Sequence, residues 1–169
     1  IDDKDAALFP KKIKGKYAIL HRIGLSIWLD FVDSLHFGKG VWIGGKVLMS
    51  PRPGEHDSRK IGIAAPPIET KYGWLLIYHG ISKRQDHHYH LRAALLDRTN
   101  PLKIIARTED PILEPEMPYE KEGEVAHVVF SCGAVVMGDR LIVYYGGADK
   151  VISVAEAKRR LSDALESPK

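Results

Sequence analysis

The hydrophobic residues of this 169-residue chain fall into short runs rather than into the long periodic pattern of helices. The runs are bounded by Gly, Pro, Asp or Lys and are rich in Val, Ile and aromatic side chains, as strands are. Turn signals such as Gly44-Gly45-Lys46, Tyr72-Gly73 and Gly138-Asp139 lie between or just before runs, as hairpin connections do. We therefore predict strands at 17–20, 41–43, 47–49, 74–78, 91–96, 102–106, 125–130, 134–137, 141–145 and 151–154.

Only the last part of the chain has a helical pattern. Between residues 155 and 165, the side chains of Ala157, Leu161, Ala164 and Leu165 follow the spacing of one helix face. We predict a short C-terminal helix over 155–165 that packs on a β body.

Three segments of the chain align with one another without gaps. Each begins with a turn, continues as an apolar strand and ends in polar residues, and they cover residues 15–22, 73–80 and 139–146. A spacing of about 60 residues with several short strands per period is typical of four-stranded propeller blades with loop insertions. Equivalent strands of a propeller surround one axis. The polar ends at His21-Arg22, His79 and Tyr145 are therefore expected to converge on one pocket.

The length of the chain conflicts with a complete propeller. About three blades fit, whereas closure needs at least about four. The first residue is Ile1 instead of Met, and acidic residues follow at once. We expect an all-β chain that is the C-terminal portion, 1–169, of a single β-propeller domain: a partial propeller of about three blades, with its N-terminal blades absent.

Composition excludes several classes of protein. The chain is 44% hydrophobic and 28% charged, which is typical of a globular domain. A net charge of +3 does not indicate a nucleic-acid partner, and the apolar runs are too short to span a membrane. The single Cys132 cannot form an internal disulfide, and no secretory signal opens the chain, so we expect a cytoplasmic protein.

Isolated basic residues lie beside apolar segments. Lys4 precedes 6–10, Arg22 ends an apolar strand, and Lys60 precedes 61–65. Such side chains can simply snorkel to the surface. Together, Lys4, Arg22 and Lys60 would also suit an oxyanion such as phosphate.

Other candidate groups are less specific. The carboxylates of Glu69, Glu120 and Asp149 follow turn residues, where they can stabilise the turn or accept sugar hydroxyls. The cluster at 86–90 contains three histidines but matches no zinc spacing, so we interpret it as a solvated loop and expect no metal. No motif marks Cys132 as a nucleophile.

Several motifs, in order along nearly the whole chain, resemble glycoside hydrolase family 130, the β-mannoside phosphorylases and related β-mannosidases. They are Lys4-Asp5-Ala6-Ala7-Leu8-Phe9-Pro10, Gly15-Lys16-Tyr17 with Leu20-His21-Arg22, Lys60-Ile61-Gly62, Pro66-Pro67-Ile68-Glu69-Thr70, Gly73-Trp74-Leu75-Leu76-Ile77-Tyr78-His79-Gly80 and Tyr145-Gly146-Gly147-Ala148-Asp149. The resemblance implies a five-bladed β-propeller with its active site on the central axis, of which this chain would be the C-terminal part.

The resemblance also implies a reaction and a site. Inorganic phosphate, the co-substrate, would attack a β-mannoside with inversion to give mannose 1-phosphate, and no cofactor would be needed. Phosphate would be held by Lys4, Arg22 and Lys60, with His79 and Tyr89 nearby. Glu120 and Asp149 would bind sugar hydroxyls. The general-acid Asp of the family lies before the first residue of this chain, so we expect no catalytic residue here and an inactive fragment.

Three alternatives remain open at this point. The hydrolytic members of the family lose the basic set, so keeping Lys4, Arg22 and Lys60 favours phosphorolysis over hydrolysis. A propeller pocket with Trp28, Trp42 and Trp74 could instead belong to a non-catalytic carbohydrate-binding module. A partial propeller could also associate with another copy as a homo-oligomer.

Overall fold

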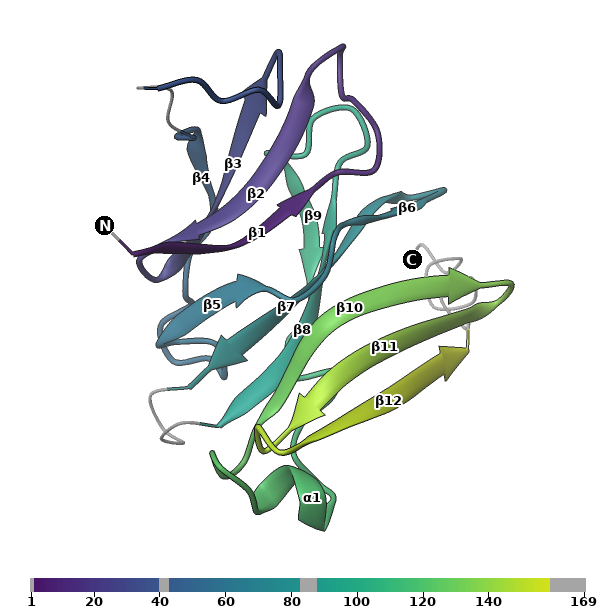
Figure 1. Cartoon of the computed structure of the whole chain (residues 1–169). Helices are drawn as coiled ribbons and strands as arrows, with labels where there is room; N and C mark the ends of the chain where they lie inside the picture. Colours follow the sequence, from purple (N-terminus) through teal and green to yellow (C-terminus); the bar gives the residue numbers. More distant parts are fainter. Residues whose placement is uncertain (1, 40–42, 83–87, 159–169) are drawn as a thin grey trace.

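The computed structural model describes residues 2–39, 43–82 and 88–158, and these form three antiparallel sheets that follow one another along the chain (Figure 1). The first sheet has the order β1-β2-β3-β4, with strands Asp3–Leu8, Tyr17–Ile23, Ser26–Val32 and Lys46–Met49. The all-β prediction is confirmed.

The second sheet is built around one long strand. The strand β7 (Gly73–Ile81) pairs on one side with β5 (Lys60–Ile63) and β6 (Ile68–Thr70). On its other side the sheet continues through β8 (Tyr89–Leu96) to β9 (Ile104–Arg107).

The third sheet has the order β10-β11-β12, with strands Val129–Met137, Arg140–Gly147 and Val151–Lys158. A one-turn helix, α1 (Pro118–Lys121), precedes it and lies at the end of this sheet where β11 turns into β12 (Figure 1). The three repeat segments form β2, β7 and β11, which are central strands of the three successive sheets, so the predicted repeat is a structural one.

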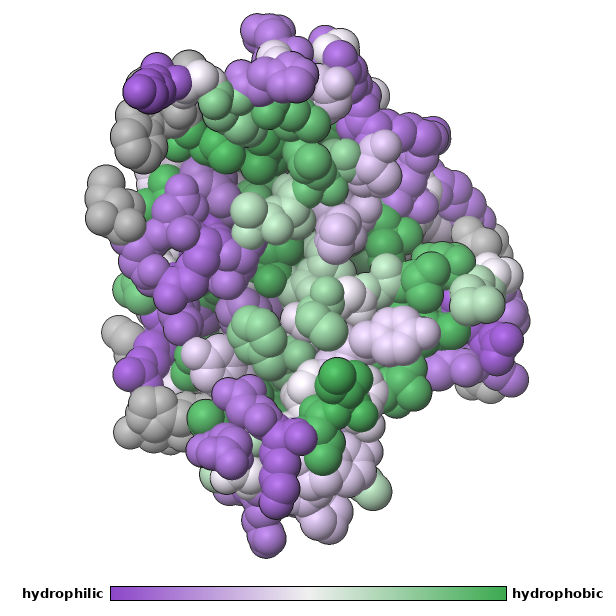
Figure 2. All heavy atoms as spheres, viewed as in Figure 1, coloured by the Kyte–Doolittle hydropathy of each residue, from purple (hydrophilic) through white to green (hydrophobic). Residues whose placement is uncertain are grey.

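Two apolar layers join the three sheets. Leu20, Ile27 and Leu76 belong to the layer that the first and second sheets share, and Ile77, Val129 and Val143 belong to the layer between the second and third. The strand β7 contributes to both layers, which explains why its apolar residues are continuous instead of alternating. The third sheet covers the second with one face only, and Figure 2 shows hydrophobic residues on the surface of the β10–β12 sheet.

The predicted C-terminal helix over 155–165 is wrong where the structure describes it. Residues 155–158 belong to β12, in which Ala155 pairs with Val143 and Ala157 with Leu141. The alanines lie two residues apart on one face of β12, a spacing that fits a strand and not one face of a helix. Residues 159–165 lie outside the described residues.

Other predicted boundaries also need correction. The strand β3 lies in the segment 25–40, where no strand was predicted, and the strands β1, β5 and β6 were not predicted either. The strand predicted at 125–130 begins only at Val129. Of the strand predicted at 41–43, residues 41 and 42 lie outside the described residues, and Ile43 is not in a strand.

Candidate functional site

The predicted phosphate ligands are brought together where the three sheets meet. In the first sheet Lys4 on β1 pairs in register with Arg22 on β2, and in the second sheet Lys60 begins β5. Two of these side chains are buried or partly buried, whereas Lys4 is exposed and forms a 3.2 Å ion pair with Asp2. Lys4 therefore lies at the margin of this group.

The guanidinium of Arg22 is buried and held by two carboxylates. Its Nε donates a 2.8 Å hydrogen bond to Asp5, and its Nη1 donates to Asp2 at 3.3 Å and to the carbonyl oxygen of Gly24. Burial lowers the pKa of Arg22, but the bonds and charges of Asp5 and Asp2 outweigh burial and raise that pKa overall. Arg22 is thus a fixed positive charge.

His79, on the central strand β7, lies at the junction of all three sheets. Its Nε2 is 3.6 Å from the carboxylate of Asp5 on β1, and its ring lies 4.5 Å, centroid to centroid, from Phe130 on β10. Burial lowers the pKa of His79 to about 4; the charge of Asp5 opposes this shift, whereas the positive charges of Lys60 and Arg22 act in the same direction as burial. The imidazole is therefore neutral at pH 7.

Lys60 and Tyr89 complete the group. The ammonium of Lys60 donates a 3.1 Å hydrogen bond to the hydroxyl of Tyr89, whose ring lies 5.7 Å from that of His79. We call Arg22, Lys60, His79 and Tyr89 the basic cluster. It combines two cations, a phenol and a neutral imidazole, and its cations and phenol are donors that suit a phosphate oxyanion.

Glu120 lies in a different environment. Its carboxylate is buried and accepts hydrogen bonds from the Tyr145 hydroxyl at 2.6 Å and from the amides of Glu116 at 2.7 Å and Met117 at 2.8 Å. Burial raises the pKa of Glu120, but these bonds lower it overall, so the group is a carboxylate at neutral pH. It forms a capping box for α1.

Asp149 lies in the turn between β11 and β12. Both Ala148 and Asp149 have positive φ, and the amide of Lys150 donates to the carbonyl of Gly147 at 3.0 Å, as in a type I′ turn. The amide of Ala148 donates to Val128, and the amide of Val128 donates to Glu120, both at 3.0 Å. The Asp149 turn and α1 are thus fixed to each other.

The same backbone segment reaches the basic cluster. The amide of Tyr89 donates to the carbonyl of His127 at 3.1 Å, next to Val128. The predicted sugar ligands therefore lie beyond Tyr89, at the end of the third sheet. Their roles and those of the phosphate ligands remain predictions.

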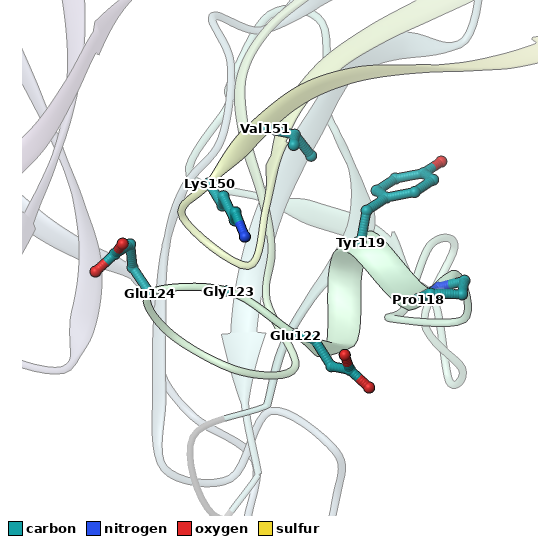
Figure 3. A pocket seen from close by; sticks show the side chains of 7 residues that line it. All are labelled: Pro118, Tyr119, Glu122, Gly123, Glu124, Lys150 and Val151. Carbon is teal, nitrogen blue, oxygen red and sulfur yellow. The ribbon is translucent and has the colours of Figure 1, made fainter.

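An open pocket of about 460 Å³ lies between α1 and the Asp149 turn (Figure 3). The ammonium of Lys150 points into it, while the carboxylate of Glu124 points away. The residues that line it are Pro118, Tyr119, Glu122, Gly123, Glu124, Lys150 and Val151.

The polar repeat positions each have a partner of their own. His21 lies 3.0 Å from Asp3 and 2.9 Å from the carbonyl of Gly44, Tyr145 bonds Glu120, and His79 faces Asp5. All three side chains are buried.

The remaining candidates lie elsewhere. Glu69 pairs with Lys11 and Arg98. Tyr89 and His90 belong to β8, with His90 buried, so the solvated-loop interpretation of 86–90 is wrong for these two; residues 86 and 87 lie outside the described residues. Within the described ranges, no group of three His, Cys, Asp or Glu is placed to hold a metal ion, and no helix has the length and apolar character of a membrane span.

Two residues of the site were not singled out from the sequence. Phe130 comes from a strand that is distant along the chain, so no local pattern reveals its contact with His79. Asp5 follows Lys4 directly, and its contacts with Arg22 and His79 depend on a backbone conformation that cannot be predicted from the sequence. The positive φ of 55° at Asp5 accompanies a bulge in β1.

The chain thus consists of successive antiparallel sheets, and the basic cluster, which suits an oxyanion, lies at their junction. The model of glycoside hydrolase family 130, described as beta-1,4-mannooligosaccharide phosphorylase, matches residues 1–167. The chain belongs to this family, as the motifs indicated.

Characterised relatives agree with this membership. The chain is 50% identical over 153 residues to the 1,2-beta-oligomannan phosphorylase of Thermoanaerobacter sp. (strain X514), a match that covers 90% of this chain and 50% of that protein. It is 43% identical to the beta-1,2-mannobiose phosphorylase of Listeria innocua, over 97% of this chain and 46% of that protein. The structure of the Listeria innocua enzyme in complex with beta-1,2-mannobiose superimposes with a TM-score of 0.85 at 42% identity, over 97% of this chain and 46% of that one. The chain spans about half the length of these relatives.

Proposed function

We propose that this chain is the phosphate-binding half of a β-mannoside phosphorylase. The observation that carries the proposal is the basic cluster, in which Arg22 and Lys60 meet His79 and Tyr89 at the junction of the three sheets. Relatives named as phosphorylases share up to half of its residues. Phosphorolysis would use inorganic phosphate as co-substrate, without a cofactor, and we place it in the cytoplasm.

The type of glycosidic linkage that we propose for the substrate follows from the sequence identities to relatives that are named for different linkages. The relatives named for β-1,2-linked mannosides are 43% to 50% identical to this chain, whereas the one named for β-1,4-linked mannooligosaccharides is 35% identical. We propose β-1,2-mannobiose or a longer β-1,2-mannan as substrate, with mannose 1-phosphate as product.

In phosphorolysis, the half of the enzyme that this chain represents would only have to bind and orient phosphate. Phosphate is already a competent nucleophile, so the protein needs to position it and offset its charge, and no general base is required. Arg22 and Lys60 would bind phosphate oxygens, with Tyr89 and Lys4 beside them. The proton for the departing oxygen would come from an acid in the other half of the enzyme.

The proposed architecture is a five-bladed propeller, to which the three sheets contribute three blades. The support is that β2, β7 and β11 are central strands of successive sheets and that β1, β7 and β10 meet around His79. The half of the relatives that this chain does not cover would supply the rest.

A chimera tests the function. The chain is joined to the N-terminal half of the 50%-identical Thermoanaerobacter 1,2-beta-oligomannan phosphorylase, and products of β-1,2-mannobiose are measured with and without phosphate. We expect mannose 1-phosphate only when phosphate is present, and no product from the chain alone. Equal release of free mannose without phosphate would instead establish a hydrolase. The hydrolase outcome has a precedent, because the family is described as also containing glycoside hydrolases that target β-1,2 mannosidic linkages in Candida mannan.

A further inference from the structure

Asp5 has an unusual backbone for a strand residue. Its φ is +55°, and the register of β1 against β2 shifts between Lys4 and Ala7. Left-handed residues inside a strand are rare for side chains other than Gly, Asn and Asp. With this bulge the Asp5 side chain is 17% exposed, whereas that of Asp2 is 54% exposed.

The carboxylate of Asp5 contacts two members of the basic cluster. Oδ2 accepts the 2.8 Å bond from Arg22 Nε and lies 3.6 Å from His79 Nε2. The neighbouring strand leaves space for this arrangement at Gly62. A Cβ at Gly62 would overlap Asp5 Oδ2 and lie 2.5 Å from the imidazole of His79.

We propose that Asp5 is a positioning residue of the phosphate site: its carboxylate orients the guanidinium of Arg22 and selects, for the buried neutral imidazole of His79, the tautomer with its proton on Nε2. This inference rests on the proposed function, because it assigns phosphate to the basic cluster. Asp5 does not itself bind phosphate, since two anions repel each other.

The tautomer follows from the charge that faces each ring nitrogen. At 3.6 Å the carboxylate is too far for a hydrogen bond, yet its charge favours a proton on the nitrogen that faces it. Nδ1 is buried and has no hydrogen-bond partner among the described residues. With the proton on Nε2, Nδ1 is an acceptor, so it would take a hydrogen bond from a sugar hydroxyl or from a protonated phosphate oxygen.

The substitution Asp5→Asn distinguishes the orienting effect of the Asp5 carboxylate on Arg22 and His79 from its electrostatic repulsion of phosphate. Asn tolerates the left-handed backbone as Asp does, so the change removes charge and keeps the shape. Coulomb's law alone predicts tighter phosphate binding when a nearby anion is removed. Positioning predicts the opposite, and we expect the Kd for inorganic phosphate, titrated into the 169-residue chain by calorimetry, to rise about tenfold or more. Asp33→Asn, which removes an exposed carboxylate paired with Lys16 outside the cluster, is the matched control and should leave Kd within about threefold.

A second variant reaches the same carboxylate without changing any charge. Gly62→Ala forces Asp5 and His79 apart from their present places, whereas Gly133→Ala, in β10, meets no atom within 4 Å. We expect the first to weaken phosphate binding and the second to leave it unchanged, with melting temperatures recorded for both. Phosphate binding that stays equal or tightens in both Asp5→Asn and Gly62→Ala would overturn the proposal while leaving the phosphorylase function intact.

The tautomer gives a readout that does not need phosphate. Two-bond 1H–15N correlation spectra of the chain distinguish a proton on Nε2 from one on Nδ1 of His79. We expect Nε2–H in the parent chain and a mixture of tautomers in Asp5→Asn. A parent chain with the proton on Nδ1 would contradict the positioning role. A parent chain that shows Nε2–H but binds no phosphate would instead count against the proposed function.

Discussion

The carboxylate of Asp57 accepts a 2.7 Å hydrogen bond from Nη2 of Arg107 at a point where none of the aspartate is exposed to solvent. Arg52 donates two further bonds of 3.1 Å, and the hydroxyl of Tyr78 donates one of 2.9 Å. The buried guanidinium of Arg92 lies 3.8 Å away. One carboxylate thus offsets three arginines between the loop before β5 and the strands β7, β8 and β9.

Replacing Asp57 with Asn should therefore destabilise the chain strongly. Breaking a buried ion pair by removing one partner costs about 3–5 kcal/mol, because the other charge stays buried without compensation. Urea unfolding at pH 7 measures this loss. The control is Asp33→Asn, which removes an exposed carboxylate paired with Lys16 and should change little. Equal stabilities of the two variants would show that solvent replaces Asp57 at no cost.

Acid should destabilise the folded chain through two buried histidines. Burial lowers the pKa of both His79 and His90 to about 4, against about 6.5 in an unfolded chain. The unfolded state therefore binds more protons between these values, so stability is lost as the pH falls from 6.5 to 4. We expect each histidine to contribute about 2 kcal/mol of loss between pH 7 and pH 5. The variant His90→Gln should remove about half of that pH dependence in urea unfolding.

The exposed His36→Gln is the control for this titration and should leave the pH dependence unchanged. If His90→Gln kept the full dependence, the loss would have to arise from other groups. The carboxylate of Asp57 does not act in the same window. Burial raises the pKa of Asp57, but its arginine and tyrosine partners lower it overall, so its contribution is lost only below about pH 4.

The sequence predicts the strands that are buried on both faces and the strands that belong to the internal repeat. The continuous apolar residues of β7 reflect its burial between two layers, and the matching segments in β2 and β11 made the repeat visible. It does not predict β1, because charged residues at its start mask a largely exposed strand. In β12, the prediction followed the helical spacing of Ala157 and Leu161 and overlooked the strand-like alternation of the small residues at 153, 155 and 157, which pair with β11.

The site was predictable to the extent that its residues lie in recognisable motifs. Arg22, Lys60, His79 and Tyr89 come from three strands of one sheet and one of another, and the structure brings these four together. The partners that orient them were not predictable. Asp5 acts through a left-handed bulge and Phe130 through packing between sheets, and both depend on tertiary structure.

Lys60 should contribute to phosphate binding chiefly through a direct, charge-assisted hydrogen bond to phosphate. A charge-assisted hydrogen bond is worth about 1.5–3 kcal/mol, so Lys60→Met should raise the Kd for phosphate about 10- to 100-fold. Tyr89→Phe removes only the hydroxyl that accepts from Lys60, and a rise of a few-fold is expected. The exposed Lys46→Met, on β4, is the matched control for the loss of one positive charge. Equal effects of Lys60→Met and Lys46→Met in calorimetric titrations would mean that the cluster attracts phosphate only through overall charge.

Glu120 offers a test of whether its contacts are structural. Oε2 accepts from the amides of Glu116 and Met117, while Oε1 accepts from the Tyr145 hydroxyl. In Glu120→Gln the amide oxygen can keep both backbone bonds, and its NH₂ can donate to the Tyr145 oxygen, so we expect a cost of about 1 kcal/mol. Glu120→Ala leaves three donors without their acceptor and should cost about 3 kcal/mol or more. Thermal unfolding compares the two with Glu124→Ala, in which the carboxylate is exposed and points away from the pocket. A large loss of stability in Glu120→Gln, equal to that in Glu120→Ala, would show that the negative charge itself is needed.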